Sequence, residues 1–231
     1  MRLVAHRGFA ASAPENTIDA VRTAAEYADA VEVDVRRCGS GELVVVHDET
    51  IDRVTDGSGA VAETALSALR DRTVLESDES IPTLARLLEA APPAVELTLE
   101  LKEPDIAADV LDTLDDAAVD NRVVTTSFLP AELRTIRDRD PEQSIGLLVS
   151  RRLETPVTTA IELDCDVLGA NRWRCLATGI VPRASAVGLE VHAWTIDRRA
   201  TAALLARRGV DGVIADRPID LPSPEPGSMT P

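Results

Sequence analysis

Residues 31–48, VEVDVRRCGSGELVVVHD, contain the pattern on which the fold and the chemistry of this chain depend. Glu32 and Asp34 stand two positions apart in a valine-rich run, and residues at that spacing point to the same face of a strand. Two carboxylates on one face of a buried strand are costly unless a cation neutralises them. The run therefore predicts a cation site, and the alternative is a surface hairpin with solvated acidic side chains and a packed histidine.

A tight turn in the same stretch is expected to bring a histidine to these carboxylates. The Gly-Ser pair at 39–40 is typical of a two-residue hairpin turn. Folding back at this turn pairs Asp34 with Val45 and Glu32 with His47. Cross-strand partners have Cβ atoms roughly 4.5–5.5 Å apart. Hard divalent cations prefer oxygen ligands, and a histidine beside such a cation can do acid–base work.

Strand-like and helical runs alternate along the rest of the chain. Eight runs are far enough apart to be parallel strands, and they begin near residues 3, 31, 94, 122, 144, 167, 190 and 211. Helices are expected at about 17–27, 64–70, 83–91, 105–118, 130–139, 156–163, 175–187 and 198–208. This pattern predicts an α/β fold, a (β/α)8 TIM barrel with an added β-hairpin after the second barrel strand. The alternative is an open doubly wound sheet.

Length and composition indicate one domain. The chain has 231 residues, 45% of them hydrophobic, which is enough for a single large core. We expect residues 1–220 to form this domain. The proline-rich polar segment 221–231 is expected to be a disordered tail.

The charge of the chain excludes some classes of partner. The formal net charge is −16, which would repel nucleic acid and anionic membrane surfaces. Lys102 is the only lysine, and this acidic, lysine-poor composition predicts a halophilic source, although an arginine-favouring genome would also contribute. No signal peptide or membrane-spanning run is visible. We expect a soluble cytoplasmic protein with no nucleic-acid partner and no stable membrane association, and the oligomeric state is not predicted.

The unusual polar residues fall where a TIM barrel places its chemistry. Catalytic groups of such barrels lie at the carboxyl ends of the strands. The polar and aromatic residues at those ends, or returned there by the hairpin, are His6, Arg7, Glu32, Asp34, His47, Glu100, Lys102 and Trp194. We therefore expect one functional site at this rim.

Several of these residues belong to motifs that resemble a known family. The motifs are His6-Arg7-Gly8, Pro14-Glu15-Asn16-Thr17, Glu32-x-Asp34, His47-Asp48-x-Thr50, Glu100-x-Lys102 and Trp194-Thr195. Their order and spacing resemble the glycerophosphodiester phosphodiesterase family, which is related in fold to PI-PLC-like phosphodiesterases. The resemblance runs from residue 3 to about 218. The sequence departs from the family pattern at Ala215, where a threonine usually precedes the aspartate, and in the hairpin turn, and neither departure touches a proposed catalytic group.

The resemblance implies a TIM barrel that binds one divalent cation, Mg²⁺ or Ca²⁺. Its metal ligands would be Glu32, Asp34 and Glu100. The general acid and base would be His6 and His47, in an order that the sequence leaves open. The groups that bind the phosphate or the rest of the substrate would be Arg7, Lys102, Glu15 and Trp194, where Trp194 either stacks on the glycerol or simply packs at the rim.

The implied activity is hydrolysis of glycerophosphodiesters, the products of phospholipid deacylation, to glycerol phosphate and an alcohol. A metal, an arginine and a lysine would stabilise the charge that builds on the phosphoryl oxygens. Two alternatives remain open. One is a phospholipase-type lyase on the same scaffold, and the other is a non-catalytic protein that binds a metal or a phosphodiester.

Overall fold

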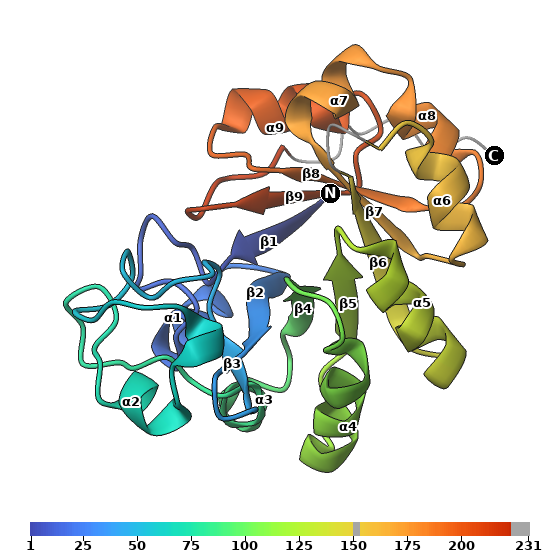
Figure 1. Ribbon diagram of the computed structural model, residues 1–231. Helices are drawn as coiled ribbons and strands as arrows, with labels where there is room; N and C mark the ends of the chain where they lie inside the picture. The colour runs from blue at the N-terminus through green and yellow to red at the C-terminus, as the bar shows by residue number, and fades with distance from the viewer. Residues whose placement is uncertain (150–152, 223–231) are drawn as a thin grey trace.

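The computed structural model describes residues 1–149 and 153–222 (Figure 1). Within them, eight parallel strands pair in sequence, and β9 pairs with β1 to close the ring. The barrel strands are β1 (Arg2–His6), β2 (Ala30–Arg37), β4 (Glu96–Leu101), β5 (Val123–Ser127), β6 (Ser144–Val149), β7 (Val167–Asn171), β8 (Glu190–Trp194) and β9 (Gly212–Ala215). The predicted TIM barrel is confirmed, and the β1–β9 pairing excludes the open sheet.

Side chains alternate between the two faces of the barrel strands. On β4, Leu97, Leu99 and Leu101 belong to the main hydrophobic core. The residues between them, Thr98 and Glu100, line a cavity inside the barrel. The alternation in the sequence therefore separates a stabilising outer face from a polar inner face.

The helices follow the expected positions with one exception. They are α1 (Ile18–Ala24), α2 (Leu66–Arg70), α3 (Leu84–Ala90), α4 (Ala107–Ala117), α5 (Pro130–Arg139), α6 (Pro156–Glu162), α7 (Arg172–Ala177), α8 (Ile180–Ser185) and α9 (Arg199–Ala206), with a 3₁₀ turn at Val61–Glu63. The single helix expected at 175–187 is wrong. Asn171 caps an earlier start by accepting a hydrogen bond from the Trp173 N–H, and the chain becomes extended at Thr178 before α8 begins.

The hairpin forms, but its register differs from the prediction by one residue. Strand β3 (Leu43–Val45) runs antiparallel to β2 and places Val45 opposite Val35, not opposite Asp34. The Cys38 N–H donates to the Glu42 carbonyl at 2.9 Å, so the loop contains residues 39–41. Gly41 adopts φ +104°, a conformation that favours glycine. A three-residue loop in place of a two-residue turn shifts every cross-strand pair by one position.

An insertion, defined here as residues 38–81 and including β3, packs around its own small core beside β2. Its buried apolar side chains are Cys38, Val44, Val46, Ile51, Val54, Val61, Leu66, Leu69, Val74 and Ile81. Figure 1 shows α2 and the neighbouring loops beside β3, away from α7, α8 and α9. The insertion therefore borders one side of the barrel mouth.

The end of the chain is described only in part. Leu221 packs against the main hydrophobic core. The rest of the expected tail, from residue 223, lies outside the described residues. No helix in the described ranges combines the length and the apolar character that crossing a bilayer requires.

Candidate active site

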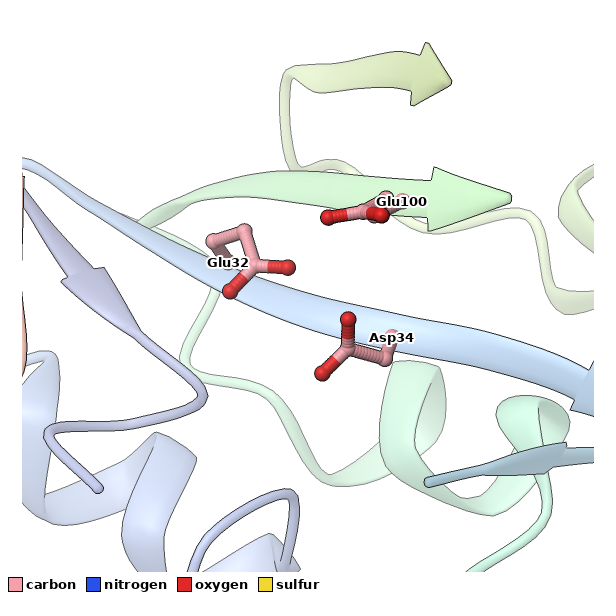
Figure 2. A group of neighbouring side chains, drawn as sticks. All are labelled: Glu32, Asp34 and Glu100. Atoms are coloured by element: carbon pink, nitrogen blue, oxygen red, sulfur yellow. The ribbon is translucent and has the colours of Figure 1, made fainter. Parts of the chain in front are cut away.

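Three carboxylates meet inside the barrel mouth (Figure 2). Glu32 and Asp34 come from β2 and Glu100 from β4, and the parallel register places Asp34 beside Glu100. One carboxylate oxygen from each residue lies within 4.8 Å of the others, and all three residues are buried. The spacing argument from the strand is therefore confirmed for Glu32 and Asp34, and the β2–β4 register adds Glu100.

The three carboxylates carry more negative charge than their protein neighbours fully balance at Glu32 and Glu100, whose pKa values are both raised. Burial raises the pKa of Glu32 to about 8, and the charge of Asp34 adds to the shift. Burial and the same aspartate also raise the pKa of Glu100. Glu32 Oε1 and Asp34 Oδ1 are buried and accept no hydrogen bond from a described residue. Three oxygen donors with two orphaned atoms fit a hard divalent cation.

Asp34 is held in place by Asn16 and kept ionised by nearby positive charges. Asn16 Nδ2 donates to Asp34 Oδ2 at 2.9 Å, and the Asp34 N–H donates back to Asn16 Oδ1 at 3.2 Å. Burial raises the pKa of Asp34, but the charges of Lys102 and Arg7 lower it more. Asn16 belongs to the Pro-Glu-Asn-Thr motif, but it was not predicted to hold Asp34.

His6 lies at the end of β1, beside Glu32 in the parallel register. Its Nδ1 is 2.5 Å from Asp216 Oδ1, and its Nε2 is 3.9 Å from Glu32 Oε2. Burial lowers the pKa of His6, but the hydrogen bond to Asp216 and the charge of Glu32 outweigh this effect, so the net shift is upward. Asp216 follows β9 at the other end of the chain and was not predicted as a site residue.

His47 reaches the site by a different route from the predicted pairing. The chain continues past β3, and His47 lines the cavity although it is not opposite Glu32. Its Nδ1 is 2.6 Å from Asp48 Oδ1. Burial, with the positive charges of Lys102 and Arg7, lowers the pKa of His47 more than Asp34 and Asp48 raise it. The predicted position of His47 is confirmed, whereas the predicted pairing is wrong.

Two cationic side chains face the carboxylates. Arg7 Nε lies 3.2 Å from Asp34 Oδ2, and the Arg7 backbone N–H donates to Glu32 Oε2 at 3.0 Å. Lys102 Nζ lies 2.5 Å from Glu100 Oε1 and 3.4 Å from Asp34 Oδ1. Both side chains also line the cavity, so they can contact an anion placed there.

The cavity itself has a volume of about 290 Å³ and combines this charged wall with an apolar one. Trp194 packs edge-on against Phe128 with ring centroids 5.8 Å apart. Trp194 lines the cavity, whereas Trp173 is 60% exposed and is not among the lining residues. Glu15 lies behind Arg7, whose Nη1 donates a hydrogen bond to the Glu15 carboxylate at 2.9 Å. Glu15, like Trp173, does not line the cavity.

Comparison with known proteins identifies the family. The sequence model of the glycerophosphoryl diester phosphodiesterase family matches residues 6–220. The chain belongs to this family. It is therefore an enzyme of the phosphodiesterase class.

Relatives of known name agree with this assignment over nearly the whole chain. A glycerophosphodiester phosphodiesterase from Caldanaerobacter subterraneus subsp. tengcongensis is 31% identical over 229 residues and covers 94% of both chains. The solved structure of a phosphodiesterase from Oleispira antarctica, in complex with the product sn-glycerol-3-phosphate, is 29% identical, with a TM-score of 0.87 and 94% of each chain covered. The solved structure of a glycerophosphodiester phosphodiesterase from Thermotoga maritima is 25% identical, with a TM-score of 0.80 and 94% of each chain covered.

Proposed function

We propose that this chain hydrolyses glycerophosphodiesters to glycerol phosphate and an alcohol, as part of phospholipid turnover. The observation that supports this best is a cavity wall in which two histidines and two cationic side chains adjoin a buried carboxylate triad, two members of which line the cavity. The product bound to the Oleispira antarctica enzyme supports glycerol phosphate as the product here.

The proposed cofactor is one divalent cation, Mg²⁺ or Ca²⁺. Glu32, Asp34 and Glu100 would hold it, since their oxygens converge and two buried ones lack donors. When bound, such a cation stabilises negative charge on phosphoryl oxygens. The chain adds Arg7 and Lys102 to the same wall, where a planar guanidinium and a compact ammonium can both contact a phosphate.

The two histidines are proposed to move the protons. In each, Nδ1 is engaged by a carboxylate, Asp216 for His6 and Asp48 for His47, which leaves Nε2 for the reactants. One imidazole takes a proton from the nucleophile, which is water or the glycerol 2-hydroxyl. The other gives a proton to the leaving alkoxide. Trp194, on the apolar wall, is placed to contact the glycerol.

The test is release of glycerol phosphate from glycerophosphocholine in high salt, with Mg²⁺, with Ca²⁺ and with a chelator. High salt suits the halophilic, cytoplasmic origin that the net charge of −16 predicts. We expect turnover that needs the cation. A folded, cation-loaded protein that leaves every glycerophosphodiester intact would contradict the proposal.

A further inference from the structure

Arg53, a residue of the insertion, joins two parts of the site without lining the cavity. Its Nε donates to Asp48 Oδ2 at 2.6 Å. Its two terminal nitrogens donate to the two oxygens of Glu15 at 2.7 and 2.8 Å. A single guanidinium thus satisfies two carboxylates at once, and the fork to Glu15 is the bidentate geometry that arginine provides and lysine does not.

Each of these carboxylates is also bonded to a group of the cavity wall. Asp48 Oδ1 is 2.6 Å from Nδ1 of His47. Glu15 Oε1 accepts a hydrogen bond from Arg7 at 2.9 Å. A continuous chain of contacts therefore runs from His47 through Asp48, Arg53 and Glu15 to Arg7. It connects the insertion with the segment that follows β1.

We propose that Arg53 is a positioning residue, which sets the orientation of His47 through Asp48 and that of Arg7 through Glu15. This inference rests on the proposed function. Asp48, fixed on one side by Arg53, holds the His47 ring so that Nε2 faces the cavity. Glu15, fixed by the same guanidinium, holds the Arg7 guanidinium toward the place where a phosphate would bind.

The surroundings of Arg53 argue against a purely structural role. Its side chain is 48% exposed, and its ion pair with Asp48, which is itself 27% exposed, is of the kind that adds little to stability. The insertion has a separate apolar core to hold it together. Glu15, by contrast, is only 6% exposed, so without Arg53 this buried carboxylate would depend on Arg7 alone. The loss of Arg53 would then redirect Arg7 more than it would unfold the insertion.

The experiment compares Arg53→Gln and Arg53→Lys with a matched control, Arg72→Gln. Arg72 lies in the same insertion, is 46% exposed and pairs with Asp56 at 4.0 Å, and neither residue lines the cavity. The measurements are kcat and KM for glycerophosphocholine, the affinity for sn-glycerol 3-phosphate by calorimetry, and the melting temperature.

We expect Arg53→Gln to lower kcat about 10- to 100-fold, since displacement of a catalytic group by ~1 Å can cost on the order of 100-fold. Binding of sn-glycerol 3-phosphate should weaken at the same time, because Arg7 is redirected. Arg53→Lys should show smaller losses of kcat and of affinity for sn-glycerol 3-phosphate than Arg53→Gln, but should not match the wild type. Arg72→Gln should match the wild type.

A double variant tests the route through Asp48. If Arg53 acts on His47 through Asp48, the Arg53→Gln substitution should lower kcat less in the Asp48→Asn background than in the wild type, and the loss that remains there is the part that acts on Arg7 through Glu15. Independent, multiplying losses would overturn this route. Wild-type kcat and product affinity in Arg53→Gln would overturn the inference as a whole, as would a loss fully explained by unfolding. A wild-type protein that neither turns over glycerophosphodiesters nor binds glycerol phosphate would instead overturn the proposed function, and this inference with it.

Discussion

The two halves of the cavity wall are built from different kinds of residue. Strands β1, β2 and β4, with the insertion, contribute His6, Arg7, Glu32, His47, Glu100 and Lys102. Strands β5 to β9 and the described residues just after them contribute aliphatic, aromatic, threonine and glycine positions, and among these described lining residues His192 is the one ionisable side chain. The first half supplies groups that bind charge and move protons. The second half supplies the mostly apolar surface that sets the shape of the cavity.

The apolar half also affects the charged half. Opposite charges attract more strongly where water is excluded, and a wall of Leu148, Val167 and Trp194 excludes water from the side facing the triad. Gly169 makes room for the Leu148 side chain in this half, because a Cβ there would lie 2.4 Å from Leu148 Cδ2. Mutations in the two halves should therefore fail in different ways.

The largest effect is expected at the centre of the charged half. Glu32→Gln keeps the size of the side chain and removes a charge that the proposed cation needs. We expect turnover to fall by at least about 1,000-fold, which corresponds to ~4 kcal/mol of lost transition-state stabilisation. Cation binding by calorimetry should weaken in parallel.

The control for this variant is Glu42→Gln, an exposed glutamate of the same hairpin whose carboxylate accepts a hydrogen bond from Ser40. It should behave as the wild type. An unchanged cation-dependent rate in Glu32→Gln would remove the triad from the chemistry.

The three histidines divide between the two halves and allow a second test. Loss of a general acid or base costs typically about 10²–10⁴-fold. We expect His6→Ala and His47→Ala to lower kcat within that range. His192 is buried against Gly212, where a Cβ would meet its ring at 2.7 Å, and His192→Gln should cost kcat far less. Equal losses in all three variants would contradict the division.

A smaller effect is expected from the aromatic side of the apolar half. Trp194→Leu should raise KM about 3- to 10-fold with little change in kcat, since an aromatic contact is worth about 0.5–1.5 kcal/mol. Trp173→Leu is the matched control, because Trp173 is exposed and does not line the cavity. If Trp194→Leu lowers kcat and leaves KM unchanged, the apolar half has a part in the chemistry that we have not assigned.

Local patterns in the sequence predicted the charged half better than its supporting contacts. The period-2 alternation of β2 was enough to place Glu32 and Asp34 on one face. The number of residues in the hairpin loop was not readable, because residues 39–41 contain two glycines that suit different turns. His47 still lines the cavity, because the chain extends past β3 before it turns away.

The hydrogen-bond partners of the two histidines show more clearly which contacts could not be predicted from the sequence. Asp216 forms a hydrogen bond with His6 although the two residues are 210 positions apart, and no local sequence pattern predicts that contact. The contacts of Arg53 could not be predicted from the sequence either, because they depend on Glu15 and Asp48 lying close together in space. Such contacts depend on the exact register of the parallel strands and on which residues meet where the barrel closes. A single sequence does not specify either of these details.

The smallest expected effect concerns stability, and it separates the two halves without an activity assay. In the cation-free protein the pKa of Glu32 is about 8, against a usual value of 4.5. Between these pH values the folded state keeps a proton that the unfolded state has lost. Stability from this group is therefore complete below about pH 4.5 and falls as the pH rises to about 8.

Thermal unfolding in chelator at pH 5, 6.5 and 8 measures this dependence. Other groups titrate in the same window, so the informative quantity is the difference between wild type and variant. Glu32→Gln should lose less stability than the wild type as the pH rises, and Trp194→Leu should follow the wild type. Added Mg²⁺ or Ca²⁺ should raise the wild-type melting temperature more at pH 8 than at pH 5, because the ion competes with fewer protons for the carboxylates. If Glu32→Gln and the wild type change in parallel, the buried carboxylate is already compensated by Arg7 and Lys102, and the charged half needs no cation to be stable.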